Sequence, residues 1–334
     1  MRYKLLGNTG LRVSELALGA MGFNDKPGAP SQQQIAGIVD AFQEAGGNVI
    51  DTAVTYGDGQ SERAVAHAVR GRREQFVLST KYTLSRDIGN ANAAGNHRKN
   101  LRFSLEASLR QLDTDYIDIY WVHLWDRHTP IEETMRALDD AVRAGKILYV
   151  GISNAPAWLV SQANTIAEWR DWTPFAGIQV PYNLLNRDAE RELIPMAEQL
   201  GLSIAVWGPL SHGRLAMSET RDGEGESESV LKVLAEVARR ASATPAQVAI
   251  AWLMSRSQSV IPILGATRAD RLAENLEAAT LTIAQEDLDS LTAANDFSLG
   301  YPREFVEGLP KWAFGAAGEV VDGRSTLRPE FDPR

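Results

Sequence analysis

The sequence predicts a (β/α)8 TIM barrel with an N-terminal β-hairpin and with a helix and tail at its C-terminal end. Short apolar runs alternate with amphipathic helical patterns about eight times, the number that closes such a barrel. Polar residues that could carry chemistry follow several different runs, whereas an open doubly wound sheet gathers them at one switch point. No Gly-x-Gly-x-x-Gly pattern follows the first strand, which argues against a Rossmann domain.

Turn signals and hydrophobic periodicity place the elements along the chain. A hairpin is predicted over residues 1–18, because alternating segments flank the turn signal Asn8-Thr9-Gly10. Residues 19–278 are assigned to the barrel, and 279–334 to an extra helix and a Gly- and Pro-rich tail. No linker divides the chain, so we expect one domain over residues 1–334. The predicted strands are 16–20, 49–52, 76–82, 116–123, 147–154, 177–182, 202–207 and 260–264. The predicted helices are 32–45, 61–70, 97–111, 131–144, 157–169, 188–200, 228–240, 245–254, 268–278 and 285–295.

Composition narrows the function classes. The chain has 334 residues, 44% of them hydrophobic, and a net charge of −9, which argues against a nucleic-acid partner. It contains no cysteine, so disulfides and thiolate catalysis are excluded. The N-terminal segment lacks the apolar core of a signal peptide, and no apolar run is long enough to span a bilayer. We therefore expect a cytoplasmic protein without a membrane partner.

Four polar residues lie at or just after predicted strand ends. Asp51 ends an apolar run, Tyr56 lies in the polar loop that follows, and Lys81 and His123 end two later strands. Taken singly, each has a structural explanation, such as an ion pair or a hydrogen-bonded core histidine. In a barrel, however, the C-terminal ends of the strands meet at one mouth, where active sites lie. The pattern therefore indicates that the four side chains form one site.

These residue types suit proton transfer to a carbonyl oxygen. A phenol has a pKa near ~10, and a nearby ammonium favours its charged form. Lys81 can supply the ammonium, Asp51 can keep it charged, and His123 can hydrogen-bond a carbonyl oxygen while hydride reaches the carbon. No serine paired with a base is found, which disfavours ester hydrolysis. A Schiff base on Lys81, as in an aldolase, is an alternative that Asp51 disfavours.

Six motifs occur in a fixed order along the chain: DTAVTYGDGQSE, STKY, DIYWVHLWD, GISN, QVPYNLLNR and WGPLSHGRL. From the hairpin to about Ala278, the chain therefore resembles the aldo-keto reductase superfamily. The resemblance implies a catalytic tetrad of Asp51, Tyr56, Lys81 and His123, with Tyr56 as the general acid. It also implies an NADPH (NADP+) cofactor bound across the barrel mouth, no metal, and a small-molecule carbonyl substrate.

The resemblance further assigns the cofactor contacts. Ser153, Asn154 and Gln179 would hold the nicotinamide carboxamide, Trp207 would stack on its ring, and backbone from residues 208–213 would line the pyrophosphate. Arg268 and Arg271 lie where a helix follows a strand, a place that attracts phosphate and favours NADPH over NADH. The expected cofactor-binding residues are Gly19, Met21, Asp51, Ser153, Asn154, Gln179, Trp207, Gly208, Pro209, Leu210, Ser211, Gly213, Arg214, Gly265, Thr267, Arg271, Glu274 and Asn275.

The substrate and the reaction direction stay open at this stage. Met21, Phe23, Trp125 and the aromatic residues of the tail could form an apolar pocket wall, whereas the Asn- and Gly-rich loop 84–100 could meet a sugar. The protein could reduce an aldehyde or ketone, or oxidise an alcohol or sugar. It could also be a cofactor-binding regulatory module like the potassium-channel β subunits. The absence of an added partner-binding domain favours the enzyme, and the sequence does not determine the oligomeric state.

Overall fold

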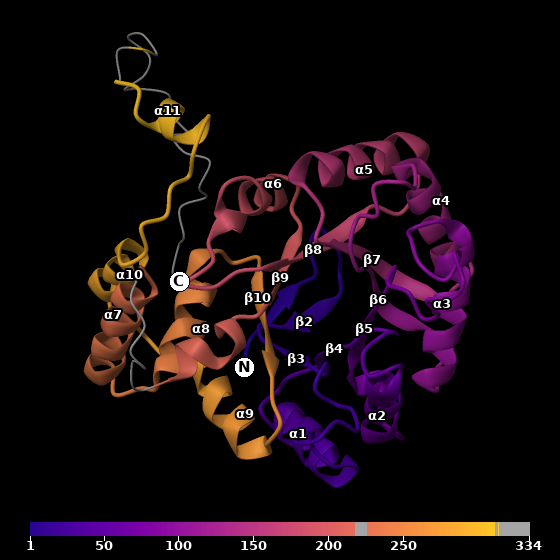
Figure 1. The fold of residues 1–334 in the computed structure, drawn as a ribbon, viewed down its shortest axis with the longest axis horizontal. Coiled ribbons are helices and arrows are strands. Elements are labelled where there is room, and N and C mark those ends of the chain that lie inside the picture. Colours follow the sequence, from indigo (N-terminus) through magenta and orange to yellow (C-terminus); the bar gives the residue numbers. More distant parts are fainter. Residues whose placement is uncertain (218–225, 311–312, 314–334) are drawn as a thin grey trace.

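The computed structural model describes residues 1–217, 226–310 and 313. The chain forms a closed barrel of parallel strands surrounded by helices (Figure 1), which confirms the predicted fold class. The strands follow one another around the barrel in the order β10-β3-β4-β5-β6-β7-β8-β9. Their bounds are β3 Ala17–Gly19, β4 Val49–Asp51, β5 Val77–Tyr82, β6 Ile117–Val122, β7 Ile147–Ser153, β8 Phe175–Pro181, β9 Ser203–Trp207 and β10 Val260–Gly265.

An antiparallel hairpin of β1 (Tyr3–Leu5) and β2 (Arg12–Ser14) precedes the barrel. Leu6 and Val13 of the hairpin pack against inward-facing side chains of the barrel strands, so the hairpin lies over one end of the barrel. The hairpin ends at Ser14, earlier than the expected residue 18, and the first barrel strand already begins at Ala17. The Asn48 side chain contributes to this boundary, because it bonds the backbone of β2 and ties the hairpin to the start of β4.

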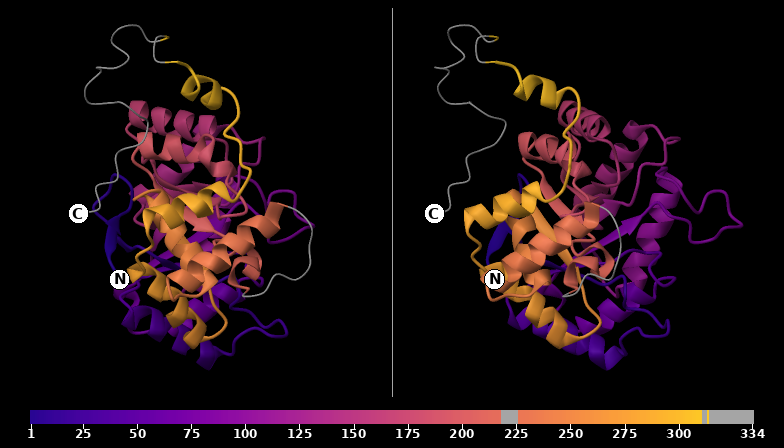
Figure 2. Two further views of the ribbon diagram at one scale, coloured as in Figure 1. Left: turned by 90° about the vertical axis from the view of Figure 1, so that its left-hand side faces the viewer. Right: turned by 60° about the vertical axis from the view of Figure 1, so that its left-hand side comes forward.

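The helices lie outside the strands, as Figure 2 also shows, and most begin and end within two residues of their predicted bounds. Two start with the capping box that their sequences encode, Ser31 with Gln34 and Thr244 with Gln247. In the described part of the chain, no helix combines the length and apolar composition needed to cross a membrane. The helices are α1 Gln32–Glu44, α2 Gln60–Ala68, α3 Arg98–Gln111, α4 Ile131–Arg143, α5 Ala157–Arg170, α6 Leu193–Gln199, α7 Glu226–Arg240, α8 Pro245–Arg256, α9 Ala269–Leu276, α10 Gln285–Ala293 and α11 Arg303–Glu307.

Two segments differ from expectation. The predicted helix 188–200 is a 3-10 turn, Asp188–Glu190, followed by α6, because Pro195 has no N–H and its ring clashes with the carbonyl four residues earlier in a continuous helix. In the tail, the short helix α11 was not predicted, and it lies outside the ring of helices (Figure 1). Residues 218–225, 311–312 and 314–334, which include the tail aromatics Trp312 and Phe314, lie outside the described residues.

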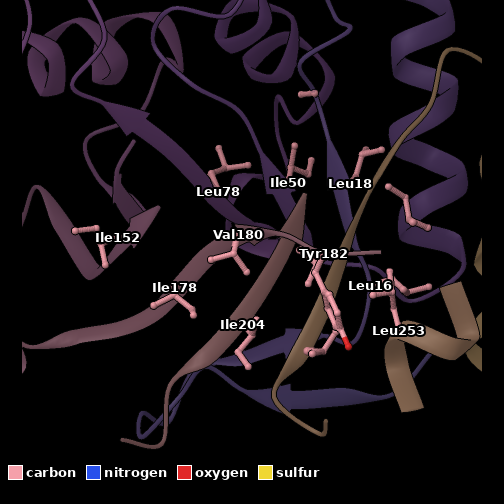
Figure 3. Close-up of a cluster of buried hydrophobic side chains, with 14 of the residues drawn as sticks. Leu16, Leu18, Ile50, Leu78, Ile152, Ile178, Val180, Tyr182, Ile204 and Leu253 are labelled. Carbon is pink, nitrogen blue, oxygen red and sulfur yellow. The ribbon is translucent and has the colours of Figure 1, made fainter. Parts of the chain in front are cut away.

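Alternate residues of the strands face two separate hydrophobic layers. Leu18, Ile50 and Leu78 belong to the large outer layer between strands and helices (Figure 3). Trp121 belongs to the inner layer, and it fills space that the glycines of the neighbouring strands leave free. A Cβ on Gly151 would lie 2.2 Å from the Trp121 ring, and one on Gly177 would lie 3.3 Å from it. The barrel interior is thus packed beneath its mouth.

Candidate active site

The four candidate catalytic residues meet at the C-terminal ends of three adjacent strands. Asp51 is the last residue of β4, Lys81 lies near the end of β5, and His123 follows β6, while Tyr56 comes from the loop between β4 and α2. Lys81 Nζ donates to Asp51 Oδ2 at 2.5 Å and to Tyr56 Oη at 3.2 Å. The His123 ring lies edge-on to Tyr56, with 5.8 Å between centroids. The fold therefore brings together the set that the sequence indicated.

The loop that carries Tyr56 is held by tight turns and by the start of α2. Gly59 adopts φ +81°, and a Cβ there would lie 2.1 Å from the Gln111 side chain of α3, so this position requires glycine. The Tyr56 carbonyl accepts backbone hydrogen bonds from Gly59 at 3.2 Å and Ser61 at 3.3 Å. Ser61 in turn donates its hydroxyl to the Ala20 carbonyl at 2.7 Å. These contacts place the phenol over Lys81.

The buried Lys81 side chain is charged. Burial opposes the charge, but Asp51 and then Tyr56 outweigh it and hold the pKa of Lys81 above its ordinary value. The second oxygen of Asp51 accepts hydrogen bonds from Ser79 Oγ at 2.7 Å and Gln179 Nε2 at 3.1 Å. Both carboxylate oxygens are therefore engaged. A charged lysine cannot attack a carbonyl as an amine nucleophile, so this geometry disfavours Schiff-base chemistry.

His123 is neutral at physiological pH. Burial, and then the positive charge of Lys81, lower the pKa of His123 to about 4. Its backbone N–H donates to the Tyr82 carbonyl at 3.1 Å, and its own carbonyl accepts from Asn154 Nδ2 at 2.9 Å. Its Nδ1 is buried and has no hydrogen-bond partner among the described residues. The ring therefore enters the site as an uncharged hydrogen-bonding group.

A row of polar side chains continues from the tetrad along β7 and β8. Asn154 Nδ2 donates to Ser153 Oγ at 2.8 Å, and Ser153 Oγ donates to the Gln179 carbonyl at 2.8 Å. Gln179 then reaches Asp51, so the row is joined to the ion pair. Asn154 adopts φ +51°, a left-handed conformation that asparagine tolerates well. Amide and hydroxyl groups in this row are suited to recognise an amide-bearing ring.

An exposed tryptophan and bare backbone extend the mouth on its other side. Trp207 ends β9, pairs in register with Pro181, and is 37% exposed although it is a large aromatic residue. A Cβ on Gly208, Gly213 or Gly265 would meet no atom within 4 Å, so the backbone there is accessible. Pro209, Leu210, Ser211 and Arg214 lie in or beside the adjoining 3-10 segment Ser211–Ala216. A planar ring could stack on Trp207, and the accessible backbone could line an extended phosphate-bearing chain.

The end of β10 forms the last part of the expected cofactor site. Gly265 pairs with Gly19 of β3. Met21, two residues after Gly19, is exposed. The exposed Arg268 immediately precedes α9 and pairs with Asp270 at 2.5 Å. Arg271 pairs with Glu274 at 2.9 Å. Both arginines therefore already have acidic partners on α9. Thr267, just before α9, is exposed, and Asn275 within α9 is half-buried.

The structure shows two residues near the site that the sequence analysis did not identify, Trp158 and Ser79, and it excludes Phe23 from the pocket wall. Phe23 is fully buried in the core, so its expected place in a pocket wall was wrong. Trp158, in the first turn of α5, is 56% exposed and lies edge-on to Trp125 with 5.4 Å between centroids. Ser79 binds Asp51, and its position two residues before Lys81 could have revealed this, because residues two apart share one face of a strand.

The chain is similar to known proteins along most of its length. The aldo/keto reductase family model matches residues 15–296. The chain is 36% identical to norsolorinic acid reductase of Aspergillus flavus, over 93% of this chain and 85% of that protein. It is also 36% identical to an aryl-alcohol dehydrogenase of Pestalotiopsis microspora, over 91% and 85%. The aldo-keto reductase ausK of Aspergillus calidoustus is 35% identical, over 96% and 88%.

The chain belongs to the aldo/keto reductase family. It is therefore an oxidoreductase of carbonyl chemistry, in a family that generally uses a nicotinamide cofactor.

Proposed function

We propose that this protein is an NADPH-dependent carbonyl reductase that converts an aldehyde or ketone into an alcohol. One observation carries the proposal: the buried Lys81 ammonium is bonded to Asp51 and lies 3.2 Å from Tyr56 Oη. Because a positive charge stabilises the phenolate left after proton transfer, this arrangement equips Tyr56 to act as a general acid.

Each member of the tetrad has a distinct role in this proposal. Tyr56 donates its hydroxyl proton to the substrate oxygen, and Lys81 stabilises the resulting phenolate. Asp51 keeps Lys81 charged and oriented. Neutral His123 donates one ring N–H to the same substrate oxygen and orients it next to Tyr56. The nicotinamide, when bound, supplies the hydride to the carbonyl carbon.

The choice of NADPH rests on residues around the mouth. The Ser153, Asn154 and Gln179 row matches the carboxamide of a nicotinamide, and the exposed face of Trp207 suits its ring. Arg268 and Arg271 lie at the start of α9, where a helix N-terminus and guanidinium groups attract phosphate. A 2′-phosphate would compete with Asp270 and Glu274 for these arginines.

An exposed tryptophan, Trp158, and the half-buried Trp125 support an aromatic substrate. Trp125 and Trp158 form an edge-to-face pair beside the mouth, and Met21 is 61% exposed. The names of relatives, an aryl-alcohol dehydrogenase and norsolorinic acid reductase, agree with an aryl carbonyl. The same site serves the reverse oxidation of an aryl alcohol, because proton and hydride transfers are reversible.

The deciding experiment measures NADPH oxidation with aryl aldehydes, aryl ketones, aliphatic aldehydes and keto-sugars, for the wild type and for Tyr56→Phe. We expect turnover by the wild type that falls about 100-fold or more in the variant, with unchanged NADPH affinity. Near-normal turnover by Tyr56→Phe would rule out this residue as the acid. Tight NADPH binding without turnover in either direction would instead favour a regulatory module.

A further inference from the structure

The first turn of α2 is bound to three consecutive barrel strands. Ser61 donates its hydroxyl to Ala20, just after β3, and accepts one from Thr52, just after β4, each at 2.7 Å. The next residue, Glu62, accepts a hydrogen bond from Thr80 Oγ1 of β5 at 2.6 Å. This turn therefore connects the ends of the strands that bear Asp51 and Lys81.

Glu62, in the first turn of α2, is a buried carboxyl group without a charged partner among the described residues. Its side chain is fully buried, and in the part of the chain that the structure describes it forms no ion pair. Its Oε2 has no hydrogen-bond partner there, and neither has the hydroxyl of Ser108 on α3, which faces the same carboxyl group. A buried carboxylate without a cation is costly, whereas a neutral carboxylic acid can donate its proton to a hydroxyl oxygen such as that of Ser108.

Glu62 is connected to both Lys81 and Tyr56 through neighbouring residues of the chain. Thr80 and Lys81 are neighbours in β5, so their side chains lie on opposite faces of the strand, with Thr80 toward α2 and Lys81 inside the barrel. Tyr56 lies in the loop that runs directly into α2, and its carbonyl is bonded by Ser61. A shift of Glu62 would therefore move Lys81 and Tyr56 relative to one another.

We propose that Glu62 is a positioning residue for carbonyl reduction, which it supports as a neutral carboxylic acid that holds β5 and the start of α2 in register. The inference rests on the proposed role of Tyr56. Ionisation of Glu62 would add a negative charge behind Lys81, which opposes the phenolate that Tyr56 must form. It would also remove the proton that the neutral acid can donate to Ser108.

The surroundings set the pH at which this change occurs. Burial raises the pKa of Glu62 to about 7, against the opposing effects of the Thr80 and Ser108 hydroxyls and of the charges on Arg63 and Lys81. The titratable groups that face Glu62 are Arg63 on α2, Lys81 on β5 and Tyr120 on β6. The carboxyl is therefore neutral below about pH 7 and ionises as the pH rises through that value.

The test compares Glu62→Gln with Glu62→Leu. Glutamine can accept a hydrogen bond from Thr80 and donate one to Ser108, as the neutral acid can, whereas leucine can do neither at similar volume. We expect Glu62→Gln to keep kcat within about 3-fold of the wild type at about pH 6 and to lose the decline of kcat above about pH 7. We expect Glu62→Leu to lower kcat about 10-fold or more with little change in the KM for NADPH. A loss in Glu62→Gln as large as that in Glu62→Leu, or an unimpaired Glu62→Leu, would overturn the proposal.

Two additions keep the result decisive. Thr80→Val, which removes the donor to Glu62 at constant shape, replaces Glu62→Leu if that variant does not fold, and the same loss of kcat is expected. Exposed Arg63→Gln, on the next residue of α2, is the matched control and should leave kcat at about pH 6 unchanged. Because the Arg63 charge lowers the pKa of Glu62, this variant should move the decline of kcat to higher pH. The infrared difference spectrum between wild type and Glu62→Gln should show the C=O band of a protonated acid at about pH 6. This readout needs no turnover, so it separates a failure of this inference from a failure of the proposed function, and absence of the band contradicts the inference.

Discussion

Lys81 and Asp51 form a buried ion pair, with Lys81 Nζ 2.5 Å from Asp51 Oδ2 and only 1% and 7% of the two side chains exposed. Lys81 also donates to the Thr52 carbonyl and to Tyr56 Oη, and Asp51 also accepts from Ser79 and Gln179. Such a pair is costly to break, because removing one partner leaves the other charge buried and uncompensated.

Asp51→Asn should therefore destabilise the fold by about 3 kcal/mol at neutral pH. The difference in the free energy of unfolding between the variant and the wild type should become smaller at alkaline pH. In the variant, burial without Asp51 depresses the pKa of Lys81, so the folded lysine loses its proton before the unfolded one does. Urea denaturation at neutral and alkaline pH measures both effects. Asp40→Asn, at the exposed ion pair with Arg72, should cost less than about 1 kcal/mol, and an equal cost at both sites would contradict the prediction.

His123 should make the protein sensitive to acid. Because the pKa of folded His123 is about 4, the unfolded chain binds a proton at this residue below about pH 6.5 while the folded chain does not. Protonation of His123 should thus not affect the free energy of unfolding above about pH 6.5. As the pH falls from there to about 4, this free energy should decrease by a total on the order of 3 kcal/mol. His123→Asn should flatten this part of the pH–stability curve. A curve of unchanged slope in the variant would show that His123 is not the group responsible.

Arg271→Ala should weaken NADPH more than NADH. If the guanidinium contacts the 2′-phosphate, its removal should raise the Kd for NADPH about 10-fold and leave the Kd for NADH unchanged. Fluorescence titration of both cofactors measures this ratio. Arg240→Ala provides a matched control, because Arg240 is also partly exposed and paired with an acid, Asp287, between α7 and α10. Equal losses for both cofactors in Arg271→Ala would mean that Arg271 does not bind the 2′-phosphate.

Gly151→Ala should destabilise the barrel by about 1–3 kcal/mol, because the new Cβ would lie 2.2 Å from the Trp121 ring. Gly37→Ala, in the middle of α1 with no atom within 4 Å of the new Cβ, should instead stabilise the protein by about 0.5–1 kcal/mol. Chemical denaturation of both variants tests this difference in sign. A neutral Gly151→Ala would show that Trp121 can move aside without cost.

Much of the fold was predictable from local patterns. The strand expected at 147–154 is β7, Ile147–Ser153, and the helix expected at 32–45 is α1, which Ser31 caps. Hydrophobic period and capping residues act over a few neighbouring positions, so they are visible in the sequence. The break before α6 could also have been foreseen from Pro195, but the short helix α11 carried no comparable signal.

The sequence by itself determined the fold class, the family and the residue types at the strand ends, because apolar periodicity and motif order are properties of the chain alone. Only the tertiary structure decided which of these groups touch, how far each is removed from water, and therefore which are charged. Lys81 keeps its charge because Asp51 lies beside it, whereas His123 is neutral because it is buried next to that charge. Burial and distances between residues far apart in the chain set these states, and neither can be derived from local sequence.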